Sequence, residues 1–66
     1  MDFKTRIRTI TNMLIDVSST DRAIIEERLL IYLEYTKHVE ISDKDLFINL
    51  IIKTKELLDE LGNGGD

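Results

Sequence analysis

Apolar residues recur along the chain at helical spacing, in three segments separated by polar links. In the first segment the apolar positions are spaced alternately by four and three residues: Phe3, Ile7, Ile10, Leu14 and Val17. This heptad pattern predicts a helix over residues 3–17, with Asp2 as its N-cap. The polar link VSSTD at 17–21 then predicts a break, after which Ser19 or Thr20 caps a second helix.

The second predicted helix, residues 21–37, is apolar around most of its circumference. Its main stripe comprises Ile25, Leu29, Tyr32, Leu33 and Thr36. A second stripe, separated from the first by Arg28, comprises Ile24, Ile31 and Tyr35. A helix that is apolar on nearly all sides is normally buried on several of them, so this helix is expected to have more than one neighbour.

The third segment begins with the clearest start signal in the chain. Ser42 and Asp45 have the spacing of a capping box, and Ile41 and Leu46 flank them as a hydrophobic staple. The pattern predicts a helix over residues 43–61 that stops at Gly62, followed by a flexible Gly-rich tail at 62–66. Its broad apolar face contains Leu46, Phe47, Leu50, Ile51, Thr54, Leu57, Leu58 and Leu61, whereas Ile48 and Ile52 point the other way.

Composition favours an all-helical domain over residues 1–61. The chain of 66 residues has no Pro, and its three Gly lie within the last five positions. We expect an all-α fold: a small antiparallel three-helix bundle, or a long helical hairpin preceded by an N-terminal helix. A chain of about 60 residues buries only about 60% of its surface. Without Cys there are no disulfides to compensate, so dimerisation is expected to complete the fold.

Apolar positions outside the main stripes predict an interface. They are Ile24, Ile31, Tyr35, Ile48 and Ile52. Burying a side chain such as Ile stabilises the folded state by about 1.5–3 kcal/mol, and this stabilisation is lost if these side chains stay in water. An exposed apolar patch also marks an interaction site. The alternative is that each of three helices, flanked by two others, simply needs a wide apolar face. We favour an interface, either with a second copy of the chain or with another protein, and the sequence leaves that choice open.

Charge narrows the classes of function. The net charge is −4, with +2 in residues 1–14 and −6 in the remainder. The acidic body argues against general nucleic-acid binding, although Lys4, Arg6 and Arg8 keep open a contact with an anionic partner. The chain offers no catalytic triad, phosphate-binding loop or metal-ligand spacing, so neither an enzyme nor a cofactor is expected.

Metal and membrane sites are also not expected. His38 is the only His and there is no Cys to stand beside it, which leaves a metal site without support. The longest apolar run, LLIYL at 29–33, is far shorter than the roughly 20 residues of a membrane span. No apolar core of a signal peptide follows the basic start of the chain. We therefore expect a cytoplasmic protein.

Residues 29–58 resemble the small connector (biofilm regulator) proteins of bacterial two-component signalling, which pair a helix, a polar-capped link and an amphipathic helix in a dimer. The similarity rests on ISDKDLFINLI at 41–51, and the preceding helix lacks the Leu-Gly of that family. The helical hairpin also resembles type III secretion co-chaperones in size and shape.

The function expected is that of a small non-enzymatic regulator, inhibitor or adaptor that binds another protein as a homodimer. One alternative is a connector-type transcriptional regulator that uses the basic first helix. The other is a secretion co-chaperone or assembly subunit that binds a partner's helix.

Overall fold

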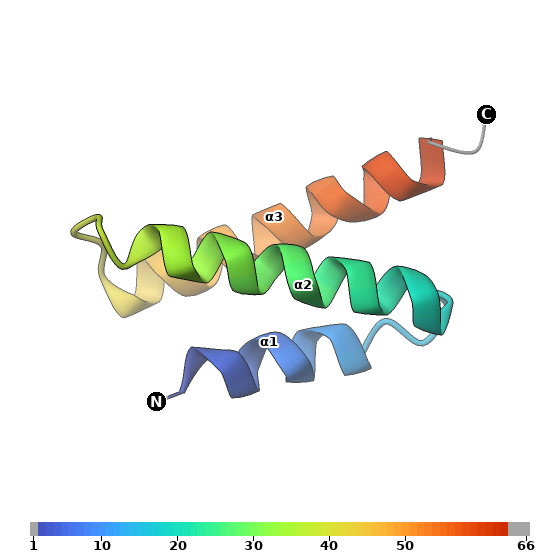
Figure 1. Ribbon diagram of the computed structural model, residues 1–66, viewed down its shortest axis with the longest axis horizontal. Helices are drawn as coiled ribbons and strands as arrows, with labels where there is room; N and C mark the ends of the chain where they lie inside the picture. Colours follow the sequence, from blue (N-terminus) through green and yellow to red (C-terminus); the bar gives the residue numbers. More distant parts are fainter. Residues whose placement is uncertain (1, 64–66) are drawn as a thin grey trace.

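The computed structural model describes residues 2–63, which form three helices joined by short links (Figure 1). They are α1 (Phe3–Asn12), α2 (Ser19–Thr36) and α3 (Asp43–Asn63), and no β-strand occurs in this range. Successive helices run in opposite directions, and α2 packs against both of the others. This confirms the expected all-helical, three-helix architecture, whereas dimerisation stays a prediction.

Polar side chains define where each helix begins. Asp2 Oδ1 accepts a hydrogen bond from the backbone N–H of Lys4 at 3.0 Å, as predicted. Ser42 Oγ likewise accepts from the N–H of Asp45 at 3.2 Å, so α3 begins where the sequence indicated. The prediction for α2 was one or two residues late: the cap is Ser18, whose Oγ accepts from the N–H of Asp21 at 3.2 Å.

The first helix ends at Asn12, five residues before the predicted boundary. Beyond Asn12 the backbone N–H groups donate hydrogen bonds to carbonyls three residues earlier in the chain. The N–H of Leu14 donates to Thr11 O at 3.2 Å, and that of Val17 donates to Leu14 O at 3.1 Å. Leu14 and Val17 nevertheless pack against the core. The apolar spacing therefore correctly identified residues that pack against the core. Leu14 and Val17, however, lie in tight turns and not in a helix.

The last helix extends past its predicted end. Gly62 and Asn63 belong to α3, and no described residue has a positive φ, so Gly62 does not act as a left-handed helix terminator. Of the predicted tail at 62–66, these two residues are therefore helical, and residues 64–66 lie outside the described range. The second helix ends at Thr36, within one residue of the prediction.

The core is aliphatic and draws on all three helices. It consists of Ile7, Ile25, Leu29, Leu33, Leu46, Leu50 and Leu57. Three threonines are buried beside it, and each hydroxyl donates to a carbonyl of its own helix, as Thr54 Oγ1 does to Leu50 O at 2.7 Å. Because buried polar groups are costly only when unpaired, these hydroxyls fit an apolar interior.

Candidate protein-binding surfaces

All five residues predicted to form an interface lie outside the core. Their exposed fractions range from 37% for Ile24 to 70% for Tyr35. On α2, Ile24, Ile31 and Tyr35 form one stripe at a spacing of seven and four residues, because such positions share a helix face. On α3, Ile48 and Ile52 lie one turn apart. We call these five residues the outer apolar surface.

Two shallow depressions between α2 and α3 link part of this surface. One, of about 460 Å³, is lined by Ile31 and Tyr35 together with Tyr32 and Leu57. The other, of about 250 Å³, is lined by Tyr32 and Ile52. Tyr32 therefore connects the apolar residues of the two helices, a role that the sequence pattern, which placed it in the main stripe, did not indicate. Ile24 and Ile48 are exposed but line neither depression.

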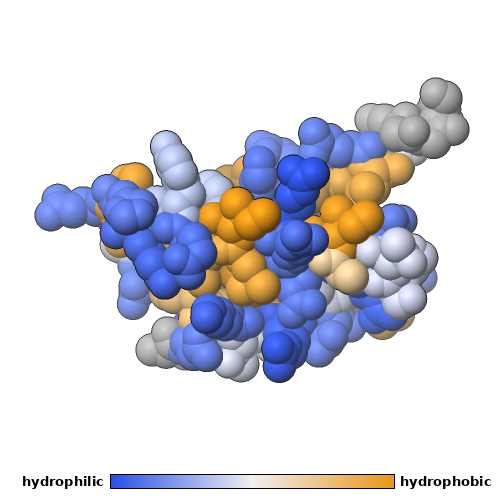
Figure 2. Space-filling view, viewed as in Figure 1, coloured by the Kyte–Doolittle hydropathy of each residue, from blue (hydrophilic) through white to orange (hydrophobic). Residues whose placement is uncertain are grey.

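Charged side chains frame the outer apolar surface. Lys53, which lines both depressions, has its Nζ 3.9 Å from Glu56 Oε2. Next to Tyr35, Lys37 Nζ donates a hydrogen bond to Glu34 Oε1 at 2.9 Å. This hydrogen bond, with the added Coulombic attraction of Lys37, lowers the pKa of Glu34 below its ordinary value. On the face drawn in Figure 2, blue hydrophilic areas separate the orange hydrophobic ones.

Further exposed apolar residues were not predicted. They are Met13, Ile15, Val39 and Ile51. The sequence assigned Ile51 to the core-facing side of α3, but its side chain is 48% exposed. α1 packs mainly on α2 and much less on α3, so part of the broad apolar face of α3 is left uncovered. Met13 follows Ile10 by three positions, and residues at this spacing lie next to each other on a helix surface. This spacing is the signal that could have indicated that Met13 lies beside Ile10.

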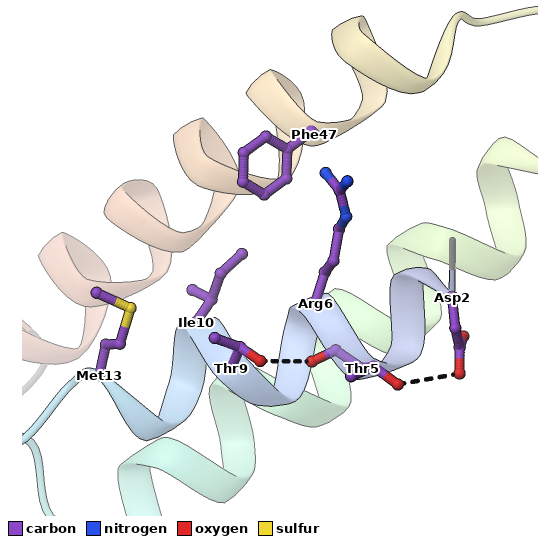
Figure 3. Close-up of a pocket in the computed structure, with 7 residues that line it drawn as sticks. All are labelled: Asp2, Thr5, Arg6, Thr9, Ile10, Met13 and Phe47. Atoms are coloured by element: carbon purple, nitrogen blue, oxygen red, sulfur yellow. Dashed lines mark hydrogen bonds between the residues drawn. The ribbon is translucent and has the colours of Figure 1, made fainter.

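An apolar groove separates α1 from α3 (Figure 3). It has a volume of about 440 Å³ and is lined by Asp2, Thr5, Arg6, Thr9, Ile10, Met13 and Phe47. Two of its polar side chains are turned to their own helix: Thr9 Oγ1 donates to Thr5 O at 2.9 Å, and Thr5 Oγ1 donates to Asp2 Oδ2 at 3.1 Å. The groove, which we call the α1–α3 groove, is therefore made largely apolar by Ile10, Met13 and Phe47.

Aromatic rings hold Arg6 at the mouth of this groove. Its guanidinium carbon lies 4.8 Å from the centre of the Phe47 ring and 5.4 Å from that of Phe3. A cation at this distance over a ring face is attracted by the ring quadrupole. The contact joins the N-terminal helix to α3 and brings a positive charge to a groove whose other charged lining residue is Asp2.

The three basic residues of the N-terminal segment face different neighbours. Arg6 is directed to the rings, whereas Arg8 Nε lies 3.7 Å from Glu26 Oε1 on α2. Lys4 lines a separate depression at the end of the bundle, together with Lys37. The cations thus do not gather into the single stripe that phosphate contacts along nucleic acid would use.

Over residues 2–63 no group of three His, Cys, Asp or Glu side chains is placed to hold a metal ion. Within the same range no helix has the length and apolar character needed to cross a membrane.

Comparison with protein-family models, curated proteins and solved structures found no significant match.

Proposed function

We propose that the chain is a small non-enzymatic regulatory or adaptor protein that acts by binding protein and forms a homodimer through its outer apolar surface. The observation that supports this proposal is the exposure of Ile24, Ile31, Tyr35, Ile48 and Ile52 on two adjacent helices. Monomeric soluble proteins rarely leave large contiguous apolar areas in water. A protein contact that covers these side chains regains the free energy that the isolated chain forgoes.

A second copy is the simplest cover for the outer apolar surface. In a two-fold symmetric dimer the same residues of both copies meet, so one exposed area supplies both sides of the contact. Arg28 borders the stripe of Ile24, Ile31 and Tyr35 on one side, and Glu27 and Glu34 border it on the other. A cation on one edge and acids on the other give two copies opposite charges to pair at the edges of the contact, which fixes their register.

Light scattering tests this proposal. At tens of micromolar the wild-type chain should scatter with about twice its mass of 7.7 kDa. Replacing two outer residues, Ile48→Lys with Ile52→Lys, should give a folded monomer because the charges enter the contact and not the core. Ile51→Lys is the control: it adds one lysine to the same helix, at an exposed position outside the outer apolar surface, and should leave the dimer intact.

The contrary result is equally specific. A wild-type monomer that loses its helical circular dichroism when Ile48 and Ile52 are charged would show that these side chains belong to the fold. The proposed dimer, and the function built on it, would then be wrong.

A further inference from the structure

A stripe of exposed apolar side chains runs along α2, and we call Ile24, Ile31 and Tyr35 the α2 stripe. Its members follow one another at seven and four positions, the spacing of the contact seam between two helices of a coiled coil. The buried residues of α2, among them Ile25 and Leu29, lie on another side of the helix. The α2 stripe is therefore available to a second helix.

The two edges of the α2 stripe carry charges of opposite sign. Arg28 lies on the edge towards α3, where it lines a depression together with Lys53 and Glu60 of that helix. Glu27 and Glu34 lie on the other edge. The edge towards α3 thus has an excess of positive charge, and the far edge is acidic.

Two of these charges have no counterpart in the described chain. Within residues 2–63 neither Arg28 nor Glu27 forms an ion pair, whereas Glu34 already accepts a hydrogen bond from Lys37. Asp21, the other acid on the Arg28 edge of α2, lies two turns away in the first turn of the helix. Arg28 and Glu27 are therefore the groups that a second copy can pair with each other.

The direction of the second helix decides which edges meet. When two identical helices pack face to face in parallel, each edge meets the opposite edge of the other helix, whereas in an antiparallel pair each edge meets its own copy. An antiparallel pair of α2 helices would place the edge with Glu27 and Glu34 against the same two acids, which repel one another. A parallel pair instead places Arg28 against Glu27 of the second copy.

We propose that two copies of the chain pair through their α2 helices, which run parallel and in register, and that Arg28 of each copy forms an ion pair with Glu27 of the other. This inference rests on the proposed function, since it assigns the geometry of the dimer proposed there. In register, Ile24, Ile31 and Tyr35 each meet their own counterpart, so the α2 stripe is covered along its whole length.

Single cysteines test this geometry, because the chain has none of its own. Ile24→Cys and Ile31→Cys are seven positions apart, about 10 Å along a helix. In a parallel pair in register, each variant places its two cysteines side by side, so both variants should form a disulfide-linked dimer under mild oxidation. Ile51→Cys, at an exposed position outside the outer apolar surface, is the control for random collision and should crosslink far more slowly.

An antiparallel pair would give a different pattern. Its two-fold axis reverses the order of positions, and a disulfide needs Cα atoms within about 7 Å of each other. At most one of the two variants, Ile24→Cys or Ile31→Cys, would then crosslink with its own copy.

Charge reversal tests the ion pairs by sedimentation equilibrium. Arg28→Glu should weaken the dimer about tenfold, because an acid then meets an acid at both edges. Adding Glu27→Arg to the same chain restores opposite charges at both edges and should return the dissociation constant to the wild-type value. In an antiparallel pair Arg28→Glu would exchange one like-charge contact for another and leave the constant unchanged. Both positions are exposed, so the fold is retained, which circular dichroism verifies.

The results judge the two proposals separately. The parallel arrangement is wrong, and the dimer stands, if the wild-type chain is a dimer but Ile24→Cys or Ile31→Cys crosslinks no faster than Ile51→Cys. An unchanged dissociation constant in Arg28→Glu would overturn it as well. A wild-type chain that is monomeric in light scattering would contradict both the arrangement and the proposed function.

Discussion

Two substitutions on one helix separate the inner and outer faces of α2. Leu29 is fully buried, whereas Ile31, two residues further on, is 59% exposed. Removing a buried Leu side chain costs about 2–5 kcal/mol, because transfer free energy is lost and a cavity remains. A domain of this length has a stability of about 3–10 kcal/mol. Leu29→Ala should therefore remove a large part of the total.

The exposed position should behave differently. Ile31→Ala removes a side chain that already contacts water, and Ala is the better helix former by a few tenths of a kcal/mol. We expect the stability of the monomer to change by less than about 0.5 kcal/mol. For Leu29→Ala, at about 4–8 °C per kcal/mol, even the lower bound lowers the midpoint of thermal unfolding by roughly 10 °C.

Thermal and urea unfolding followed by circular dichroism measure both effects. Each variant should be studied at about 1 µM and at about 100 µM, because a dimer makes the midpoint depend on concentration. Ile31→Ala should match the wild-type midpoint in the dilute sample and fall below it only in the concentrated one. A loss in the dilute sample as large as that of Leu29→Ala would refute the division of α2 into a core face and an outer face.

Three further predictions follow from hydrogen bonds and charge. Ser42→Ala should lower the free energy of unfolding by about 1 kcal/mol in urea denaturation, and a loss below a few tenths would show that the cap is unimportant. Lys37→Gln should raise the pKa of Glu34 in an NMR titration, because the hydrogen bond and Coulombic attraction that lower it are removed. Since the lowered pKa belongs to the folded state, the contribution of this pair is present above the ordinary carboxyl pKa and is lost as the pH falls through the lowered value. Random duplex DNA should not bind at physiological salt. Salt-sensitive micromolar binding that disappears with Lys4→Glu and Arg8→Glu would instead support the nucleic-acid alternative.

Helix starts and the core were readable from the sequence because short-range chemistry fixes them. Asp2 and Ser42 cap their helices through hydrogen bonds to N–H groups two or three residues away, and such bonds depend only on local order. The misplaced cap of α2 lay among consecutive hydroxyl residues, where Ser18, Ser19 and Thr20 are chemically equivalent candidates. Only the position of the helix relative to its neighbours distinguishes them.

The outer apolar surface was also readable, since each of its residues lies off the main stripe of its own helix. A single interior cannot receive two faces of one helix, so exposure followed from spacing alone. The way these residues are brought together did not follow from spacing. Tyr32 lines one depression with Ile31 and another with Ile52, an arrangement that depends on how α2 and α3 are packed.

The sequence by itself determined the helical class, two of the three caps, the buried stripes and the residues that those stripes leave outside. These depend on periodicity and on bonds between near neighbours. Only the tertiary structure decided that α1 ends at Asn12, that Ile51 stays exposed, and that Arg6 lies over Phe47 at the mouth of an open groove. The physical reason is that α1 and α3 are distant in sequence and make few contacts with each other, so their separation is set by how each packs on α2.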